Sequence, residues 1–194
     1  MLRSFDLDAI GRSAARFDFA KLENLNGHYL RAMPDAEVTE RLKALVPELP
    51  NGGELAGKID AEGWQKLERA LPGLKERAKT LVELLDNAEY LFAKRPLALD
   101  AQAQKLLDEA GRKVLGALLR RLEGVEPWTP EALDTAVRAY AEEAGLKLGK
   151  VAQPLRAALT GRATSPGIFD VLEVLGRDES IARIRDQVLE TNTA

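Results

Sequence analysis

Apolar residues recur every three or four positions along most of the chain, which is the spacing of one buried face of an α-helix. The longest such pattern runs from Leu74 to Phe92 and predicts a single helix of about five turns. A second long pattern covers residues 102–123, where additional leucines widen the apolar stripe. That width predicts a helix with neighbours on more than one side.

Shorter patterns are bounded by recognisable start and stop signals. Asp18 is placed to cap a helix that Pro34 stops, and Thr129 followed by Pro130 is typical of a helix start. Gly145 is placed to end the helix that Thr129 begins. Further helices are predicted over residues 37–45, 62–71, 151–159, 169–175 and 181–189.

The order of these segments indicates how the chain is divided. Residues 47–53 contain two prolines and two glycines, so they are predicted to form a loop. After Gly145 the helices become shorter, which indicates two subdomains joined near residues 123–130, with the helix over 102–123 as the connector. The pattern therefore predicts an all-α fold of two consecutive helical bundles.

Composition supports this interpretation. The chain has 194 residues, of which 45% are hydrophobic, 30% are charged and only 5% are aromatic, and Ala, Leu, Glu, Lys and Arg dominate. Such a mixture is typical of a soluble helical protein. No apolar run approaches the roughly 20 residues of a membrane span, and the first residues lack a signal-peptide core, so we expect a cytoplasmic protein with no membrane partner.

The charge balance argues against one class of partner. The chain carries 28 Lys and Arg against 31 Asp and Glu, a formal charge of −3, whereas proteins that hold nucleic acid by general attraction to phosphate are usually basic. Residues 145–194 hold seven basic and six acidic side chains, a nearly neutral balance. That balance fits selective contacts better than general attraction.

The residue inventory offers no convincing enzyme site. There is no cysteine and only one histidine, His28, which excludes a thiolate nucleophile and a metal site built from several histidines. Gly52 and the Gly57-Lys58 pair have the spacing of a phosphate-binding loop, but Ile59 stands where a Mg²⁺-binding hydroxyl is needed. We therefore expect neither a metal nor a cofactor in this chain.

The most unusual sequence segment lies near the end of the chain. A short helix bears Arg156 and is closed by Gly161, and a polar turn that includes Thr164–Ile168 follows. An arginine supplies five rigid donors and a turn presents backbone groups, a combination that suits recognition of an unstacked base. The alternative is an ordinary surface arginine beside a helix–helix loop, which the chemistry alone favours.

Two long stretches resemble one family. Residues 16–31, RFDFAKLENLNGHYLR, resemble the segment that follows the catalytic core of bacterial glutamyl-tRNA synthetases. Residues 148–161, LGKVAQPLRAALTG, together with SPGIF at 165–169 and VLG at 174–176, resemble the extreme carboxyl end of that family. The resemblance extends over essentially the whole chain in the expected order.

The resemblance implies a tRNA-binding region in three parts: a stem-contact segment at residues 1–60, a first anticodon-binding subdomain at 61–125 and a second one at 126–194. The implied partners are glutamate tRNA, with glutamine tRNA as a further possibility, and the catalytic domain of the parent synthetase. The family's ATP-binding signatures are absent, so we expect no glutamate activation by this chain, and ATP and Mg²⁺ belong to the absent domain. We also expect a monomer.

The resemblance also assigns site residues. The helix around residues 72–92 would be the other anticodon-facing element, with Arg69, Arg77 and Lys79 as candidates, of which we select Arg77. In the family, an arginine in this subdomain helps to distinguish glutamate tRNA from glutamine tRNA. The remaining expected contacts are Arg156, Thr164, Ser165, Pro166, Gly167 and Ile168. The alternative function is a free-standing, synthetase-derived module that binds another protein.

Overall fold

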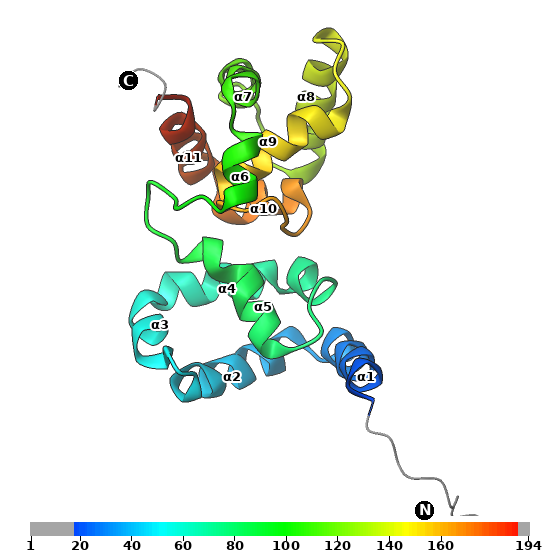
Figure 1. Ribbon diagram of the computed structural model, residues 1–194, viewed down its shortest axis with the longest axis vertical. Helices are drawn as coiled ribbons and strands as arrows, with labels where there is room; N and C mark the ends of the chain where they lie inside the picture. Colours follow the sequence, from blue (N-terminus) through cyan, green and yellow to red (C-terminus); the bar gives the residue numbers. More distant parts are fainter. Residues whose placement is uncertain (1–17, 190–194) are drawn as a thin grey trace, which may run out of the picture.

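In the computed structural model, residues 18–189 are described, and all of their regular elements are helical, so the predicted all-α fold is confirmed (Figure 1). The first elements are α1 (Phe19–Ala32), α2 (Asp35–Leu45), the 3-10 turn η3 (Val46–Glu48), α3 (Gly52–Lys58), α4 (Ala61–Lys75), α5 (Leu81–Ala88) and the 3-10 turn η4 (Glu89–Leu91). The remaining helices are α6 (Ala101–Leu106), α7 (Glu109–Leu122), α8 (Pro130–Glu143), α9 (Leu148–Thr160), α10 (Ile168–Leu175) and α11 (Arg177–Leu189).

These helices form two lobes, which we call the N-terminal lobe (α1 to η4) and the C-terminal lobe (α6 to α11) (Figure 1). In the N-terminal lobe α4 contacts α1, α2 and α5, and in the C-terminal lobe α7 contacts α8, α9 and α11. The chain passes between the lobes through residues 92–100. By packing, α7 thus belongs with the C-terminal helices, while the functional division at residues 60 and 125 stays a prediction.

The predicted continuous helix over 74–92 is wrong. Helix α4 ends at Lys75, and a new helix begins after Thr80, whose hydroxyl accepts a hydrogen bond of 3.1 Å from the backbone N–H of Glu83. The Glu83 carboxylate accepts one of 2.8 Å from the N–H of Lys79 in return. This reciprocal capping satisfies free donors at the start of α5 and lets the chain change direction between the two helices.

The predicted helix over 102–123 is also wrong as a single element. It is divided at Leu107 and Asp108, and the Asp108 carboxylate caps the new helix by accepting a hydrogen bond of 2.8 Å from the N–H of Gly111. A side chain at Gly111 would collide with the carbonyl of Leu106. The glycine therefore permits the close approach of α6 to α7.

The predicted loop at residues 47–53 is only partly correct. Its first residues form η3, and α3 already begins at Gly52, whose N–H donates to the carbonyl of Leu49 at 2.8 Å. Gly52 is buried, and an added Cβ would lie 2.2 Å from the Val46 carbonyl oxygen. Gly52, one of the residues on which the loop prediction rested, thus allows a tight connection into α3.

Several predicted helix boundaries are confirmed. The Asp18 carboxylate accepts a hydrogen bond from the N–H of Lys21 at the start of α1. Thr129 caps α8, with Pro130 in the first helical position. Gly145 follows the end of α8 with a φ of 65°, a left-handed conformation that favours glycine.

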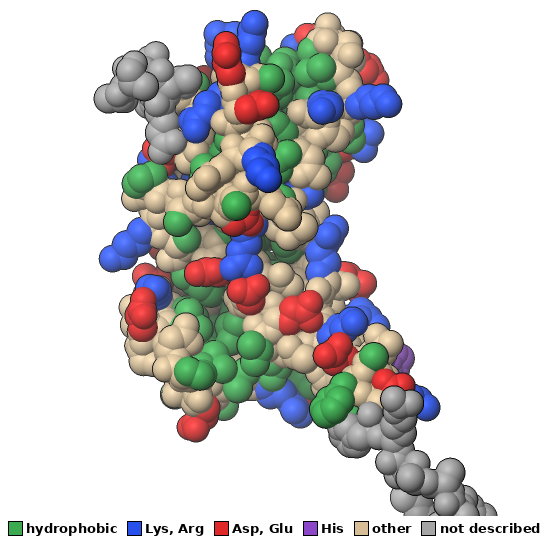
Figure 2. Space-filling view, in the orientation of Figure 1, with side chains coloured by type: hydrophobic (Ala, Val, Ile, Leu, Met, Phe, Trp, Pro, Cys, Tyr) green, Lys and Arg blue, Asp and Glu red, His purple; other side chains and the backbone are tan. Residues whose placement is uncertain are grey.

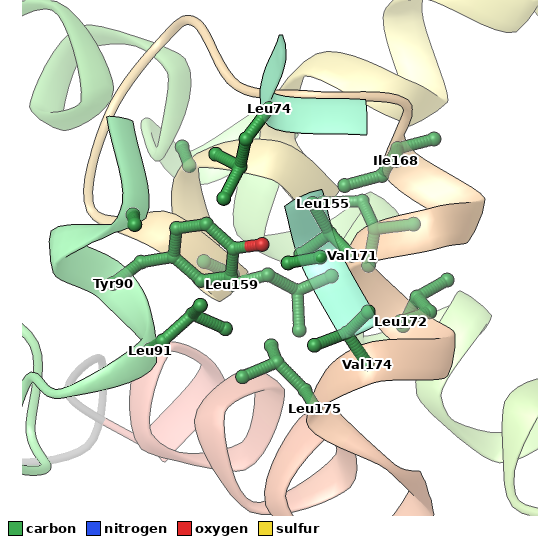
Figure 3. Close-up of a cluster of buried hydrophobic side chains, with 14 of the residues drawn as sticks. Leu74, Tyr90, Leu91, Leu155, Leu159, Ile168, Val171, Leu172, Val174 and Leu175 are labelled. Carbon is green, nitrogen blue, oxygen red and sulfur yellow. The ribbon is translucent and has the colours of Figure 1, made fainter. Parts of the chain in front are cut away.

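The two lobes share one hydrophobic core (Figure 3). Leu74 of α4 and Tyr90 and Leu91 of η4 lie against apolar side chains of α9 and α10, and helices α4 and α10 are in direct contact. The labelled partners from the C-terminal lobe are Leu155, Leu159, Ile168, Val171, Leu172, Val174 and Leu175. The junction between the lobes is thus a packed interior, which fixes the position of residues at its edge.

Candidate nucleic-acid interface

Arg156 is the best-positioned cation at the lobe junction. It lies on α9 and is partly buried, and its Nε donates a hydrogen bond of 3.0 Å to Oγ of Ser165. The Ser165 hydroxyl in turn donates to the carbonyl of Pro166 at 2.9 Å. The α9–α10 turn (residues 161–167) therefore sets the direction of the Arg156 guanidinium.

Arg77 comes from the other lobe. It lies in the turn between α4 and α5, is exposed, and its backbone N–H donates to the carbonyl of Leu74 at 3.1 Å. Burial lowers the pKa of Arg156, and the positive charge of Arg77 lowers it further. A Cβ added at Gly73 would lie 3.5 Å from Cβ of Pro166, so the end of α4 that precedes Arg77 lies against the turn that follows Arg156. No acidic side chain among residues 18–189 forms an ion pair with either arginine.

The structure separates the three candidates in this part of the chain. The Lys79 ammonium lies 3.8 Å from the Glu23 carboxylate of α1, which partly neutralises its charge. Arg69 lines a small cavity of about 190 Å³ between α4 and α10, together with Gly73, Pro166 and other residues. Of the three, Arg77 is the one whose positive charge lowers the pKa of Arg156.

Only part of the α9–α10 turn is accessible. Thr164 is exposed and Gly167 is half-buried, whereas Ser165, Pro166 and Ile168 are buried. The Ile168 side chain lies in the shared core (Figure 3). The side chains that can reach a ligand are therefore those of Arg77, Arg156 and Thr164, and the buried members of the predicted set can act only by holding the turn in place.

Sequence reasoning missed Arg162 as a contact between the lobes. Its guanidinium donates to both carboxylate oxygens of Asp86, at 2.7 and 3.0 Å, and to Glu89 at 2.5 Å. These hydrogen bonds lower the pKa of Asp86 and raise that of Arg162. Arg162 and Asp86 are 76 residues apart, so no local pattern could have paired them.

The surface has mixed charge. Figure 2 shows basic and acidic side chains interspersed over the visible face, and side chains of both signs adjoin at the waist between the lobes. Within residues 18–189 no group of three or more His, Asp or Glu side chains is arranged to hold a metal ion. None of the described helices is long and apolar enough to cross a membrane.

Comparison with known families identifies the region that contains this junction. The sequence model of the family described as "Anticodon binding domain" matches residues 37–188. The chain belongs to the anticodon binding domain family. The matched range includes Arg77, Arg156 and the whole α9–α10 turn, so both arginines lie inside the part of the chain that matches the family.

Curated relatives show the same relationship. The chain is 62% identical over 187 residues to glutamate–tRNA ligase 1 of Beijerinckia indica and 60% identical over 187 residues to a glutamate–tRNA ligase of Rhodopseudomonas palustris. Each alignment covers 96% of this chain and 40% of the relative. The chain therefore spans about 40% of the length of the ligases it matches.

Solved structures share the fold. A glutamate–tRNA synthetase from Elizabethkingia anophelis aligns with a TM-score of 0.72 at 26% identity, over 95% of this chain and 34% of that one. A glutamate tRNA ligase from Elizabethkingia meningosepticum, in complex with its amino acid, aligns with a TM-score of 0.73 at 24% identity, over 95% and 35% of the two chains. The helical arrangement of the anticodon binding domain is thus shared with distant relatives.

Proposed function

We propose that this chain binds tRNA at the lobe junction and reads the anticodon of glutamate tRNA for a glutamate–tRNA ligase. One observation carries the proposal: Arg77 and Arg156 come from different lobes, on segments that meet at the lobe junction, and have no acidic partner among the described residues. Two cations that repel each other are stabilised by an anion or an electron-rich base placed between them.

The chemistry of the site fits a base better than a bare phosphate. Arg156 is partly buried and held by Ser165, so its planar group is fixed in direction. A fixed guanidinium can hydrogen-bond to a base edge and stack on its face. Thr164, which precedes Ser165 in the sequence, is exposed and carries a hydroxyl. The net charge of −3 leaves little general attraction for RNA, which favours selective contacts of this kind.

Binding assays with purified tRNAs test the proposal. We expect the chain to bind glutamate tRNA more tightly than unrelated tRNAs at low salt, with glutamine tRNA, whose anticodon differs in the third base, as the closest competitor. Arg156→Ala should weaken binding of glutamate tRNA about tenfold and reduce the discrimination. Equal affinity for all tRNAs, or no binding, would contradict the proposal.

The matched control is Arg138→Ala. Arg138 lies on α8, is exposed, and pairs with Asp134 at 2.8 Å on its own helix. The substitution removes the same charge as Arg156→Ala but lies away from the junction. We expect it to leave the preference for glutamate tRNA unchanged.

We further propose that the chain alone does not activate glutamate and that ATP and Mg²⁺ act in a catalytic domain that it assists. Support comes from the comparison, since the match is to an anticodon binding domain and to 40% of each ligase. Glutamate-dependent ATP–pyrophosphate exchange by the purified chain would refute this part. The same assay with a full-length relative serves as the positive control.

One observation favours a second candidate, a module that docks another protein. Helix α1 exposes large apolar side chains on its surface, namely Phe19, Leu22, Leu25 and Tyr29. Exposed apolar groups in one element are typical of interaction surfaces. A protein that copurifies with the chain and survives nuclease treatment would support this candidate, whereas copurified tRNA would support the first.

A further inference from the structure

Arg156 near the end of α9 and Arg162 in the α9–α10 turn are in opposite electrostatic situations. Arg156 has no ion pair among the described residues, whereas Arg162 contacts Asp86 and Glu89 of the N-terminal lobe. Arg162 and its two partners together carry a net negative charge. A phosphate placed there would be repelled, so Arg162 is poorly suited to bind RNA directly.

The geometry of Arg162 is that of a clamp. Two of its nitrogens reach the two oxygens of Asp86 in a forked pair, and its side chain is only 32% exposed. Forked arginine–carboxylate pairs fix orientation as well as distance. The clamp therefore ties the start of the α9–α10 turn to α5 and η4 across the lobe junction.

The clamp is connected to Arg156 through the backbone. The Thr160 hydroxyl donates to the carbonyl of Arg156 at 2.9 Å and accepts from the N–H of Arg162 at 3.3 Å. Between them, Gly161 has a φ of 73° and its carbonyl accepts a hydrogen bond of 2.9 Å from the N–H of Asp100. A shift of Arg162 thus moves the segment that holds Arg156.

We propose that Arg162 is a positioning residue for tRNA recognition: by clamping Asp86 and Glu89 it holds the α9–α10 turn, and with it Arg156, at a fixed place relative to Arg77. The inference rests on the proposed function of the junction. It assigns Arg162 no contact with RNA.

The decisive experiment is the double variant Asp86→Asn with Glu89→Gln. It removes two negative charges, so electrostatics alone would strengthen binding to a polyanion. If Arg162 positions the turn, loss of the clamp should instead weaken binding of glutamate tRNA about fivefold. Binding that is unchanged or tighter overturns the inference.

The salt dependence gives a second readout. Arg156→Ala should reduce the slope of log affinity against log salt by about one, because a direct cationic contact is lost. Arg162→Ala should weaken binding while leaving that slope unchanged. A reduced slope for Arg162→Ala would mean that Arg162 contacts RNA itself, which contradicts the inference.

Arg95→Ala is the structural control. Arg95 also forms a long-range ion pair, at 2.8 Å with Asp186 of α11, but it lies in the 92–100 connection and not in the α9–α10 turn. We expect it to change thermal stability to a similar extent as Arg162→Ala and to leave tRNA affinity unchanged. Equal loss of affinity in both variants would show a general effect of weakening the junction.

A measurement without tRNA separates this inference from the proposed function. Hydrogen exchange of the Arg156 Nε–H, followed by NMR, reports its bond to Ser165. Exchange should be faster in Arg162→Ala than in the parent chain, and unchanged exchange contradicts the inference. If the parent chain binds no tRNA, the proposed function fails whatever the exchange result.

Discussion

Both lobes bury large leucines, but they differ in the polar side chains that they bury. In the N-terminal lobe the largest fully buried side chains are leucines of α2, α4 and α5, and Thr39 is the one buried polar residue among those described there. The C-terminal lobe also buries polar groups, namely Thr160, Ser165, Ser180, Arg183 and Gln187. Two of these, Thr160 and Ser165, hold the segment that carries Arg156.

The difference shows how each lobe holds its atoms in position. Leucine packing stabilises an arrangement but tolerates small shifts, whereas buried hydrogen bonds fix particular atoms at particular distances. Arg183, only 2% exposed, donates to the carbonyl of Leu159 at 2.7 Å near the end of α9. The C-terminal lobe therefore fixes the end of α9 next to the proposed anticodon site.

The largest expected effect lies in the leucine core of the N-terminal lobe. Leu67→Ala removes a fully buried side chain from α4 and should lower the free energy of unfolding by about 4 kcal/mol, because a cavity remains. Since both lobes share one core, chemical denaturation should still show one transition. Val82→Ala, at a residue 53% exposed in the same lobe, should change the free energy by about 0.5 kcal/mol or less.

Next comes the buried polar network of the other lobe. Arg183→Ala should cost about 3 kcal/mol, because it leaves the Leu159 carbonyl unpaired and breaks the 2.6 Å pair with Glu179. Arg185→Ala, two positions along α11, loses an exposed pair with Glu123 and should cost about 1 kcal/mol or less. Similar unfolding midpoints for both variants would refute the contrast.

A smaller effect tests the turn after α9. Gly161→Ala should cost about 2 kcal/mol, because φ is 73° and the new Cβ would lie 2.4 Å from the Ala98 carbonyl oxygen. Gly145 has a similar φ of 65° with open space around it, so Gly145→Ala should cost about 1 kcal/mol. Equal losses of stability in the two variants, measured by thermal unfolding, would show that the close approach to Ala98 does not contribute.

The smallest effect concerns pH. Hydrogen bonding to Arg162 lowers the pKa of Asp86 below its usual value in the folded state, so the unfolded chain binds more protons and stability rises with pH in this range. The contribution is complete above the usual value near 3.8 and is lost as pH falls through the lower folded pKa. Because the Asp86 side chain is 62% exposed, the effect should be below about 1 kcal/mol.

That effect can be isolated by comparing two chains. The parent chain should lose slightly more stability between neutral and acidic pH than Asp86→Asn does. Identical pH profiles would mean that the clamp contributes nothing measurable to folding. The tRNA-binding role of Arg162 is measured separately by its own variants.

The sequence predicted the helical class and most helix positions, because those follow from local periodicity and caps. The two broken helices show the limit of periodicity, since the apolar spacing continues across each break. Local signals for both breaks were nevertheless present: Thr80 and Glu83 have the spacing of a capping box, and Asp108 precedes an acidic first turn. Capping chemistry should therefore take precedence over a continuous apolar stripe.

The candidate site was predictable only in part. Arg156 and the turn after it stood out as an unusual sequence segment. Their assignment to the anticodon site came from the family resemblance. Contacts between segments that are far apart in the sequence decide which side chains of the turn are buried. They also decide that Arg77 and Arg156 meet at the same junction. The same holds for Arg162, because its two carboxylate partners come from the other lobe.

The single passage of the chain between the lobes, through residues 92–100, makes the protein divisible (Figure 1). Each half contributes apolar side chains to the shared hydrophobic core, so two separately produced pieces should reassemble on mixing. The cut belongs near Lys94, before the stretch where Ala98 and Asp100 contact Gly161. Since Arg77 and Arg156 would then come from different polypeptides, tRNA binding would report the reunion of the halves.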